Sequence, residues 1–242
     1  MNAIEIKSLT KHYKDTVAVD NLNLSIEEGE LFSLLGVNGA GKTTTIKMLS
    51  CLSTPTSGDA ILLGNSVINN PNEVKSLIAV SPQETAVAPK LTVKENLELI
   101  CGIYEFSTEK SASKIEELTE LLGLNNVINK HAGKLSGGYA RRLSIAMALI
   151  SEPKILFLDE PTLGLDVIAR SELWDVIRSL KGKVTIILTT HYMEEAEELS
   201  DRIGIMKNGK LIMCETPEAI KSITNQESIE KAFIDIVRGK AQ

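Results

Sequence analysis

Aromatic residues and positive charge are both scarce in this sequence of 242 residues. Aromatic side chains make up 4% of it, which is few for a surface that binds single-stranded nucleic acid by base stacking. Asp and Glu (32) outnumber Lys and Arg (26), so the net charge is -6 and the basic excess that phosphate-backbone binding requires is missing. We therefore expect no nucleic-acid partner.

Long hydrophobic segments are also missing. The longest uninterrupted apolar run covers residues 145–150, whereas a membrane-spanning helix needs about 20 residues. We expect that the chain does not cross a membrane by itself, and its short, charged N-terminal stretch is unlike a signal peptide. Cys51, Cys101 and Cys214 form no CxxC pair, and we expect them to be reduced thiols.

The sequence does contain a regular alternation of predicted strands and helices. Residues 3–9 and 17–26 alternate apolar with polar positions, which predicts an antiparallel sheet. Short apolar strands that alternate with helices predict a parallel sheet covered on both faces. These strands are expected at 30–35, 60–63, 77–80, 155–159, 184–190 and 202–206, and the helices at 43–52, 139–151 and 166–181.

Residues 86–140 have a different pattern, because apolar residues recur there every three or four positions, as in amphipathic helices. Thr92 and Glu95 fit a capping box at the start of the first helix. We predict that this block is a helical insertion.

A glycine-rich segment, GVNGAGKTT at residues 36–44, fits the pattern GxxxxGK[ST] between a strand and a helix. Such glycines let successive backbone N–H groups curl around an anion, and the following helix adds the positive end of its dipole. Lys42 can reach the outer phosphates of a nucleotide, and the Thr43 hydroxyl can bind Mg²⁺. The predicted nucleotide-binding residues are Gly36, Asn38, Gly39, Ala40, Gly41, Lys42, Thr43 and Thr44.

The apolar strand at 155–159 ends in two acids, Asp159 and Glu160. In an open parallel sheet, ligands bind at the carboxyl ends of the strands. Asp159 could hold Mg²⁺ through water, and Glu160 could orient or deprotonate an attacking water. Solvated acids commonly end a strand, and it is the glycine-rich segment upstream that favours the functional interpretation.

Leu135-Ser-Gly-Gly138 precedes a further predicted helix. By the same logic it is a second anion site, although in isolation a plain helix cap would be the simpler interpretation. A single phosphate site seldom needs two such loops from one chain.

Together these segments resemble the ATP-binding cassette (ABC) ATPases, and the resemblance covers nearly all of the chain. Residues 36–44, 155–160 and 135–139 are similar to the Walker A, Walker B and signature segments of that family. Weaker matches follow the family's order: Tyr13 for the aromatic that stacks on adenine, Gln83 for the Q-loop, residues 163–166 for the D-loop and His191 for the switch histidine.

Three positions depart from the commonest family pattern. Val37 and Val167 stand where Pro is frequent, and Tyr139 stands where the signature usually has Gln. None of these changes removes a phosphate donor or a carboxylate.

The resemblance implies that ATP and Mg²⁺ are the ligands and that ATP is hydrolysed. Glu160, His191 and Lys42 would be the catalytic residues, and Thr43, Gln83 and Asp159 would hold the metal. A second ABC subunit, identical or not, would close the site. The residues implied at that closure are Ser136, Gly137 and Gly138, together with Asp166.

The resemblance also implies a transmembrane permease subunit in a separate chain, with this chain bound peripherally at the cytoplasmic face of the membrane. The helical block and the loop after Gln83 are expected to carry the docking surface. Residues 217–220 and 227–237 look like the tail of cassettes that serve ABC-2-type exporters. An equally simple interpretation is an amphipathic closing helix that buries Ile229, Phe233 and residues 236–237.

A different class of function stays open: a regulatory module that senses nucleotide without turnover. Glu160 and His191 count against it, because such a module would have no use for them.

The fold expected is α/β, with a P-loop ATPase core, an N-terminal antiparallel subdomain and an inserted helical subdomain. Residues 1–85 and 141–220 would form the core with its antiparallel sheet, residues 86–140 the helical subdomain, and residues 221–242 a C-terminal helical tail.

Overall fold

The structure is a computed structural model and describes residues 1–239. The strands are β1 (Asn2–Tyr13), β2 (Thr16–Glu27), β3 (Leu31–Gly36), β4 (Ser57–Leu62), β5 (Asn65–Ser66), β6 (Ile78–Ser81), β7 (Ile155–Asp159), β8 (Thr185–Thr190), β9 (Arg202–Lys207) and β10 (Lys210–Glu215). The helices are α1 (Lys42–Leu49), α2 (Pro71–Leu77), α3 (Val93–Ile103), α4 (Thr108–Leu121), α5 (Gly137–Leu149), α6 (Val167–Leu180), α7 (Met193–Leu199), α8 (Pro217–Thr224) and α9 (Ile229–Arg238).

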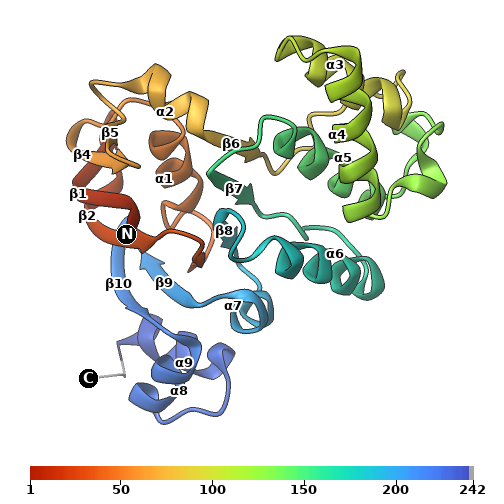
Figure 1. The fold of residues 1–242 in the computed structure, drawn as a ribbon. Helices are drawn as coiled ribbons and strands as arrows, with labels where there is room; N and C mark the ends of the chain where they lie inside the picture. The colour runs from red at the N-terminus through yellow and green to blue at the C-terminus, as the bar shows by residue number, and fades with distance from the viewer. Residues whose placement is uncertain (240–242) are drawn as a thin grey trace.

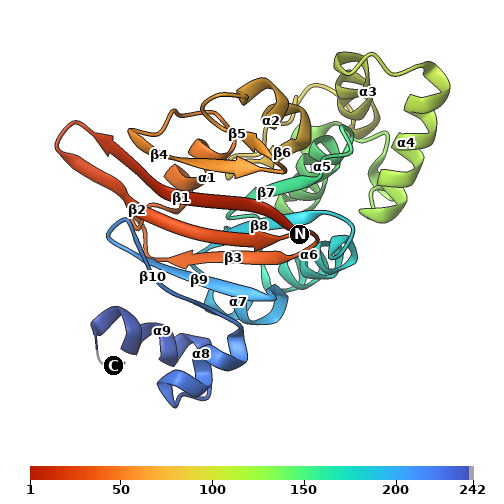
Figure 2. The ribbon, with the colours of Figure 1, turned by 60° about the vertical axis from the view of Figure 1, so that its left-hand side comes forward.

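The strands form two sheets, seen side by side in Figure 2. The antiparallel sheet has the order β2-β1-β4-β5, and the larger sheet has the order β10-β9-β3-β8-β7-β6. Strands β9, β3, β8, β7 and β6 run parallel, whereas β10 pairs antiparallel with β9. The predicted α/β fold with both kinds of sheet is confirmed.

Strand β7 shows why the central strands are apolar at every position. Ile155 and Phe157 belong to the core cluster that contains α1 and the antiparallel sheet. Leu156 and Leu158 belong to the cluster formed with α3, α4, α5 and α6. Because successive side chains point to opposite faces, a strand between two helical layers must be hydrophobic on both.

Several local features differ from the sequence-based expectation. Helix α1 ends at Leu49 rather than residue 52, because Cys51 takes a left-handed backbone with φ of 57°. Helix α2, which opens with Pro71, helix α7 and the short strand β5 were not expected as elements. Strand β10 follows a turn at Asn208 and Gly209, whose φ values of 49° and 79° suit a tight hairpin.

Helices α3 and α4 lie at the far end of the molecule from β1 and β2 (Figures 1 and 2). The expected capping box opens α3: the Glu95 N–H donates to Thr92 Oγ1 at 3.2 Å, and the Thr92 N–H donates to Glu95 Oε2 at 2.7 Å. These helices share one apolar cluster with α5 and α6. The division of the chain at residues 85, 140 and 220 stays a prediction.

Helices α8 and α9 form a pair beyond the end of β10 (Figure 1). Ile229, Phe233 and Ile236 of α9 are buried in a third cluster with Ile203 and Ile205 of β9. The amphipathic closing helix predicted from the sequence is therefore confirmed. The likeness to exporter tails is a separate matter that this packing leaves as a prediction.

The structure bears on the state of the cysteines and on the length of the apolar helices. Cys51, Cys101 and Cys214 are free thiols. Among residues 1–239, no helix combines the length and the apolar character that crossing a bilayer requires.

The packing of α9 predicts unequal effects of two neighbouring substitutions. Phe233 is 4% exposed and Ile234 is 39% exposed. Phe233→Ala should lower the free energy of unfolding by about 3 kcal/mol, because it leaves a cavity, whereas Ile234→Ala should cost about 1 kcal/mol or less. Urea unfolding of both variants measures the difference, and equal losses of unfolding free energy would contradict this packing of α9.

Candidate functional site

The glycine-rich loop joins β3 to α1 and depends on backbone shapes that glycine adopts easily. Gly39 and Gly41 have φ values of 81° and 109°. A Cβ on Gly41 would lie 2.5 Å from the carbonyl oxygen of Ala18. The loop therefore keeps its curve and its close approach to β2 only with glycine at position 41.

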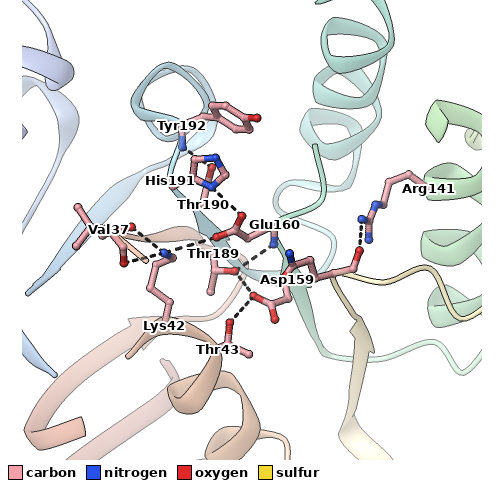
Figure 3. A network of polar contacts seen from close by, with 12 residues as sticks. Val37, Lys42, Thr43, Arg141, Asp159, Glu160, Thr189, Thr190, His191 and Tyr192 are labelled. Atoms are coloured by element: carbon pink, nitrogen blue, oxygen red, sulfur yellow. Dashed lines mark hydrogen bonds and ion pairs between the residues drawn. The ribbon is translucent and has the colours of Figure 1, made fainter. Parts of the chain in front are cut away.

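Lys42 is the first residue of α1, and its side chain runs back along the inside of the loop (Figure 3). Its Nζ donates to the carbonyl oxygen of Gly36 at 2.7 Å and lies 3.6 Å from Glu160 Oε1. Burial lowers the pKa of the Lys42 ammonium, and the charges of Glu160 and Asp159 oppose that shift. The lysine thus connects the loop to the two acids at the end of β7.

Asp159 ends β7 beside Thr189 of β8, its neighbour across the parallel pair. Its Oδ1 accepts hydrogen bonds from Thr189 Oγ1 at 2.5 Å and from Thr43 Oγ1 at 3.3 Å. Carboxylate and hydroxyl oxygens are ligands that Mg²⁺ prefers, so this pair suits a magnesium ion. The sequence did not predict Thr189 in the site, because only the register of β7 and β8 places it beside Asp159.

Glu160 has a left-handed backbone with φ of 48°, which is uncommon for a residue with a side chain. Its N–H donates to the Thr189 carbonyl oxygen at 3.0 Å. Its Oε2 lies 2.7 Å from His191 Nδ1, and because an ionised carboxylate can only accept, the histidine donates here. The turned backbone thus aims the carboxylate between Lys42 and His191 (Figure 3).

Lys42, Thr43, Glu160 and His191 face one cavity of about 590 Å³. Asp159 and Thr189 are not among the residues that line it. It collects residues from the loop, from the segment after β6 and from the ends of β7 and β8. Part of its wall comes from residues 16–18 of β2, which were not predicted to belong to the site, and from Leu163, the first residue of the segment matched to the D-loop. The predicted residues on the wall are Asn38, Gly39, Ala40, Gly41, Lys42, Thr43, Thr44, Gln83, Glu160 and His191.

Other predicted site residues lie outside this cavity. Tyr13 is 46% exposed at the end of β1, and its hydroxyl oxygen lies 3.5 Å from Ser53 Oγ. Asp166 caps α6 by accepting a hydrogen bond from the Ala169 N–H at 2.9 Å. The roles assigned to both residues from the family resemblance stay predictions.

The signature segment also lies apart from the cavity of its own chain. Ser136 and Gly137 are exposed at the start of α5, and Gly138 is buried. A Cβ on Gly138 would lie 3.0 Å from the Ala169 side chain, so α5 packs closely on α6 there. The exposed end of α5 is free to face another molecule.

A buried acid lies behind the His191 strand end. Glu195 of α7 is fully buried, and its Oε1 accepts a hydrogen bond from Trp174 Nε1 at 3.1 Å. Burial raises the pKa of this carboxyl, while the hydroxyls of Thr190 and Thr162 and the charge of Arg170 oppose the shift. Glu195 therefore links α7 to α6, four residues after His191 in the chain.

Known proteins resemble this chain along most of its length. A family model described as "ABC transporter" matches residues 19–163, a range that contains the glycine-rich loop and both acids. "Probable multidrug ABC transporter ATP-binding protein YbhF" of Escherichia coli (strain K12) is 40% identical over 240 residues, covering 97% of this chain and 41% of that protein. The chain thus spans about two fifths of the length of this relative.

A shorter relative and a solved structure agree with that match. "Daunorubicin resistance ATP-binding protein DrrA2" of Streptomyces coeruleorubidus is 38% identical and is covered to 71% of its length by 94% of this chain. The dimeric structure of a post-hydrolysis state of the ATP-binding cassette MJ0796 bound to ADP and Pi has a TM-score of 0.78 and 29% identity. That match covers 88% of this chain and 98% of the other.

The buried Glu195 predicts a pH-dependent stability. Because its pKa is raised above the ordinary value of 4.5, the native state keeps the proton to a higher pH than the unfolded state does. The contribution of this group to stability therefore falls as the pH rises above about 4.5.

Glu195→Gln keeps an oxygen for Trp174 and should remove that fall, whereas Glu195→Ala should cost about 1–3 kcal/mol, because it strands the indole N–H. Urea unfolding at several pH values from 4.5 to 8 compares the variants. The same pH slope in wild type and Glu195→Gln would show that another group is responsible.

Proposed function

The chain belongs to the ABC transporter family, and we propose that it binds and hydrolyses ATP to drive a separate transmembrane subunit. The observation that carries the proposal is the cavity that joins the glycine-rich loop to Glu160 and His191. The loop supplies a nucleotide site, and the acid–histidine pair supplies the means to activate water. The proposal of ATP hydrolysis needs both the nucleotide site and the acid–histidine pair.

The chain's own groups can bind the phosphates of ATP. Backbone N–H groups of Gly39 and Gly41, at the start of α1, suit an anion. The Lys42 ammonium already lies inside the loop and would pair with the outer phosphates instead of the Gly36 carbonyl. Thr43 and Asp159, with Gln83 on the wall, would hold Mg²⁺, which when bound neutralises charge on the phosphates.

Glu160 would act as the general base toward an attacking water. Its Oε1 and Oε2 are engaged by Lys42 and His191, which hold the carboxylate in place at the cavity wall. His191 would keep its Nδ1 on Glu160 and orient the water and the outer phosphate with the rest of its ring. These roles need only small movements, because the three side chains are already in contact.

A second ABC subunit would complete the site. The signature segment, Ser136 to Gly138, does not line the cavity of its own chain, and Ser136 is exposed. Its backbone amides would therefore contact a phosphate of ATP held in the cavity of another copy or of a similar chain. ATP would then lie between two subunits, and hydrolysis would separate them.

The surface proposed to dock the transmembrane subunit lies between β6 and the helical block. A groove of about 460 Å³ runs there beside α3 and α5. Its lining includes Leu52 and Ile103, which are 69% and 66% exposed. Such exposed apolar side chains suit a partner protein. Bound to a transmembrane subunit, this chain would be a peripheral protein at the cytoplasmic face of the membrane.

Export is the direction of transport that we propose. Its support is the resemblance of the tail to cassettes of ABC-2-type exporters and the relative named for daunorubicin resistance. The competing function, a nucleotide sensor without turnover, would leave the contacts of Glu160 with Lys42 and His191 without a purpose. Steady-state ATPase activity of the purified chain separates the two.

The assignment of Glu160 predicts a trapped complex. Glu160→Gln should lower the rate of ATP hydrolysis by about 100-fold or more, because the general base is lost. It should still bind ATP and form a dimer that elutes earlier in size-exclusion chromatography with light scattering. Glu98→Gln, at an exposed acid of α3, is the control, and wild-type turnover in Glu160→Gln would refute the assignment.

The proposed docking groove predicts a loss of membrane association. Leu52→Glu and Ile103→Glu should shift the chain from the membrane pellet to the supernatant when it is sedimented with membranes of its native cells. ATP hydrolysis by the isolated chain should stay within about 2-fold of wild type. Ile223→Glu is a matched control, because Ile223 is 57% exposed on α8, outside the groove. Equal loss of association with the control variant would rule out the groove.

A further inference from the structure

Arg141 makes an unusual connection inside the molecule. It lies in the second turn of α5 and is 4% exposed. Its Nη1 donates to the Pro82 carbonyl oxygen and its Nη2 to the Gln83 carbonyl oxygen, both at 2.5 Å. One planar guanidinium thus holds two successive carbonyl groups of the segment that follows β6.

The chemistry of this contact argues for positioning rather than for stability. Burial lowers the pKa of Arg141, and the more distant charges of Asp159 and Glu195 oppose that shift. The bonds of its Nη atoms go to neutral carbonyls, which compensate poorly for the desolvation of a cation. An apolar side chain would fill this position at less cost, but it would not hold the backbone of Gln83.

A second contact joins the same two segments. Ser81 Oγ and Ser144 Oγ lie 3.0 Å apart, buried, about one turn farther along α5. The segment 81–83 is therefore attached to α5 at three successive residues. A displacement of α5 would carry the backbone of Gln83 with it.

The two ends of this connection reach different nucleotide contacts. Gln83 lines the cavity of its own chain, whereas the start of α5 carries the exposed signature segment. We propose that Arg141 is a positioning residue that couples Gln83 to the signature segment, so that each cassette links its own nucleotide site to that of its partner. This inference rests on the proposed function.

The coupling has a consequence for hydrolysis by the dimer. A nucleotide contact at Gln83 would be transmitted through Arg141 to the segment that closes the second site. Loss of the guanidinium fork should therefore slow hydrolysis and weaken cooperativity between the sites. It should leave the glycine-rich loop, and with it the binding of ADP to a single chain, unchanged.

The test is a double-mutant cycle between Arg141 and Gln83. Arg141→Met should lower kcat by about 10-fold and reduce the Hill coefficient for ATP, with the Kd for ADP within about 2-fold of wild type. In a Gln83→Ala background, Arg141→Met should change kcat by less than about 3-fold, because the residue acts through Gln83. Arg141→Lys, which cannot make the fork, should behave like Arg141→Met.

Arg142 provides the matched control. It is a buried arginine of the same helix, but its side chain bonds to Glu172. The effects of Arg142→Met and Gln83→Ala on kcat should multiply, and thermal unfolding identifies any variant that is simply unstable. If the effects of Arg141→Met and Gln83→Ala on kcat also multiply, the coupling is refuted. A fall in ADP affinity that parallels the fall in kcat refutes it as well.

The outcome also separates this inference from the proposed function. If the wild-type protein does not hydrolyse ATP, both the proposed function and the coupling are overturned. If the wild type hydrolyses ATP but the effects of Arg141→Met and Gln83→Ala on kcat multiply, only the coupling is overturned. If Arg141→Met proves too unstable to assay, the cycle with Arg141→Lys gives the same decision.

Discussion

The constraint on which this structure depends is the burial of the Lys42 ammonium between a glycine-rich loop and the acids at the end of β7. A charge in an apolar interior needs polar partners, and Lys42 finds them in the Gly36 carbonyl and Glu160. Those partners meet only because β3, β8 and β7 run parallel and end at one edge of the sheet. The apolar strands thus bring loop and acids together.

Glu160 shows how local strain serves the arrangement. Its left-handed backbone, which is costly for a residue with a side chain, is held by hydrogen bonds from its N–H to Thr189. That conformation aims the carboxylate at both Lys42 and His191.

The helical block is joined to the sheet by more than apolar packing. Its cluster is continuous with α5 and α6, and α5 in turn bonds to the segment after β6 through Ser144 and Arg141. Gln83 therefore lies where the helical block, the sheet and the cavity meet. A surface that docks a partner beside α3 would be mechanically connected to the nucleotide site.

The sequence by itself determined the features that depend on neighbouring residues. The glycine-rich loop, the capping box at Thr92 and the strands apolar on both faces are demands of local backbone and burial, so they can be read from short segments. Only the tertiary structure decided that Thr189 meets Asp159, that Arg141 holds Gln83, and that Tyr13 stays outside the cavity. Such contacts join residues far apart in the chain, and strand register and helix packing, which no short segment encodes, create them.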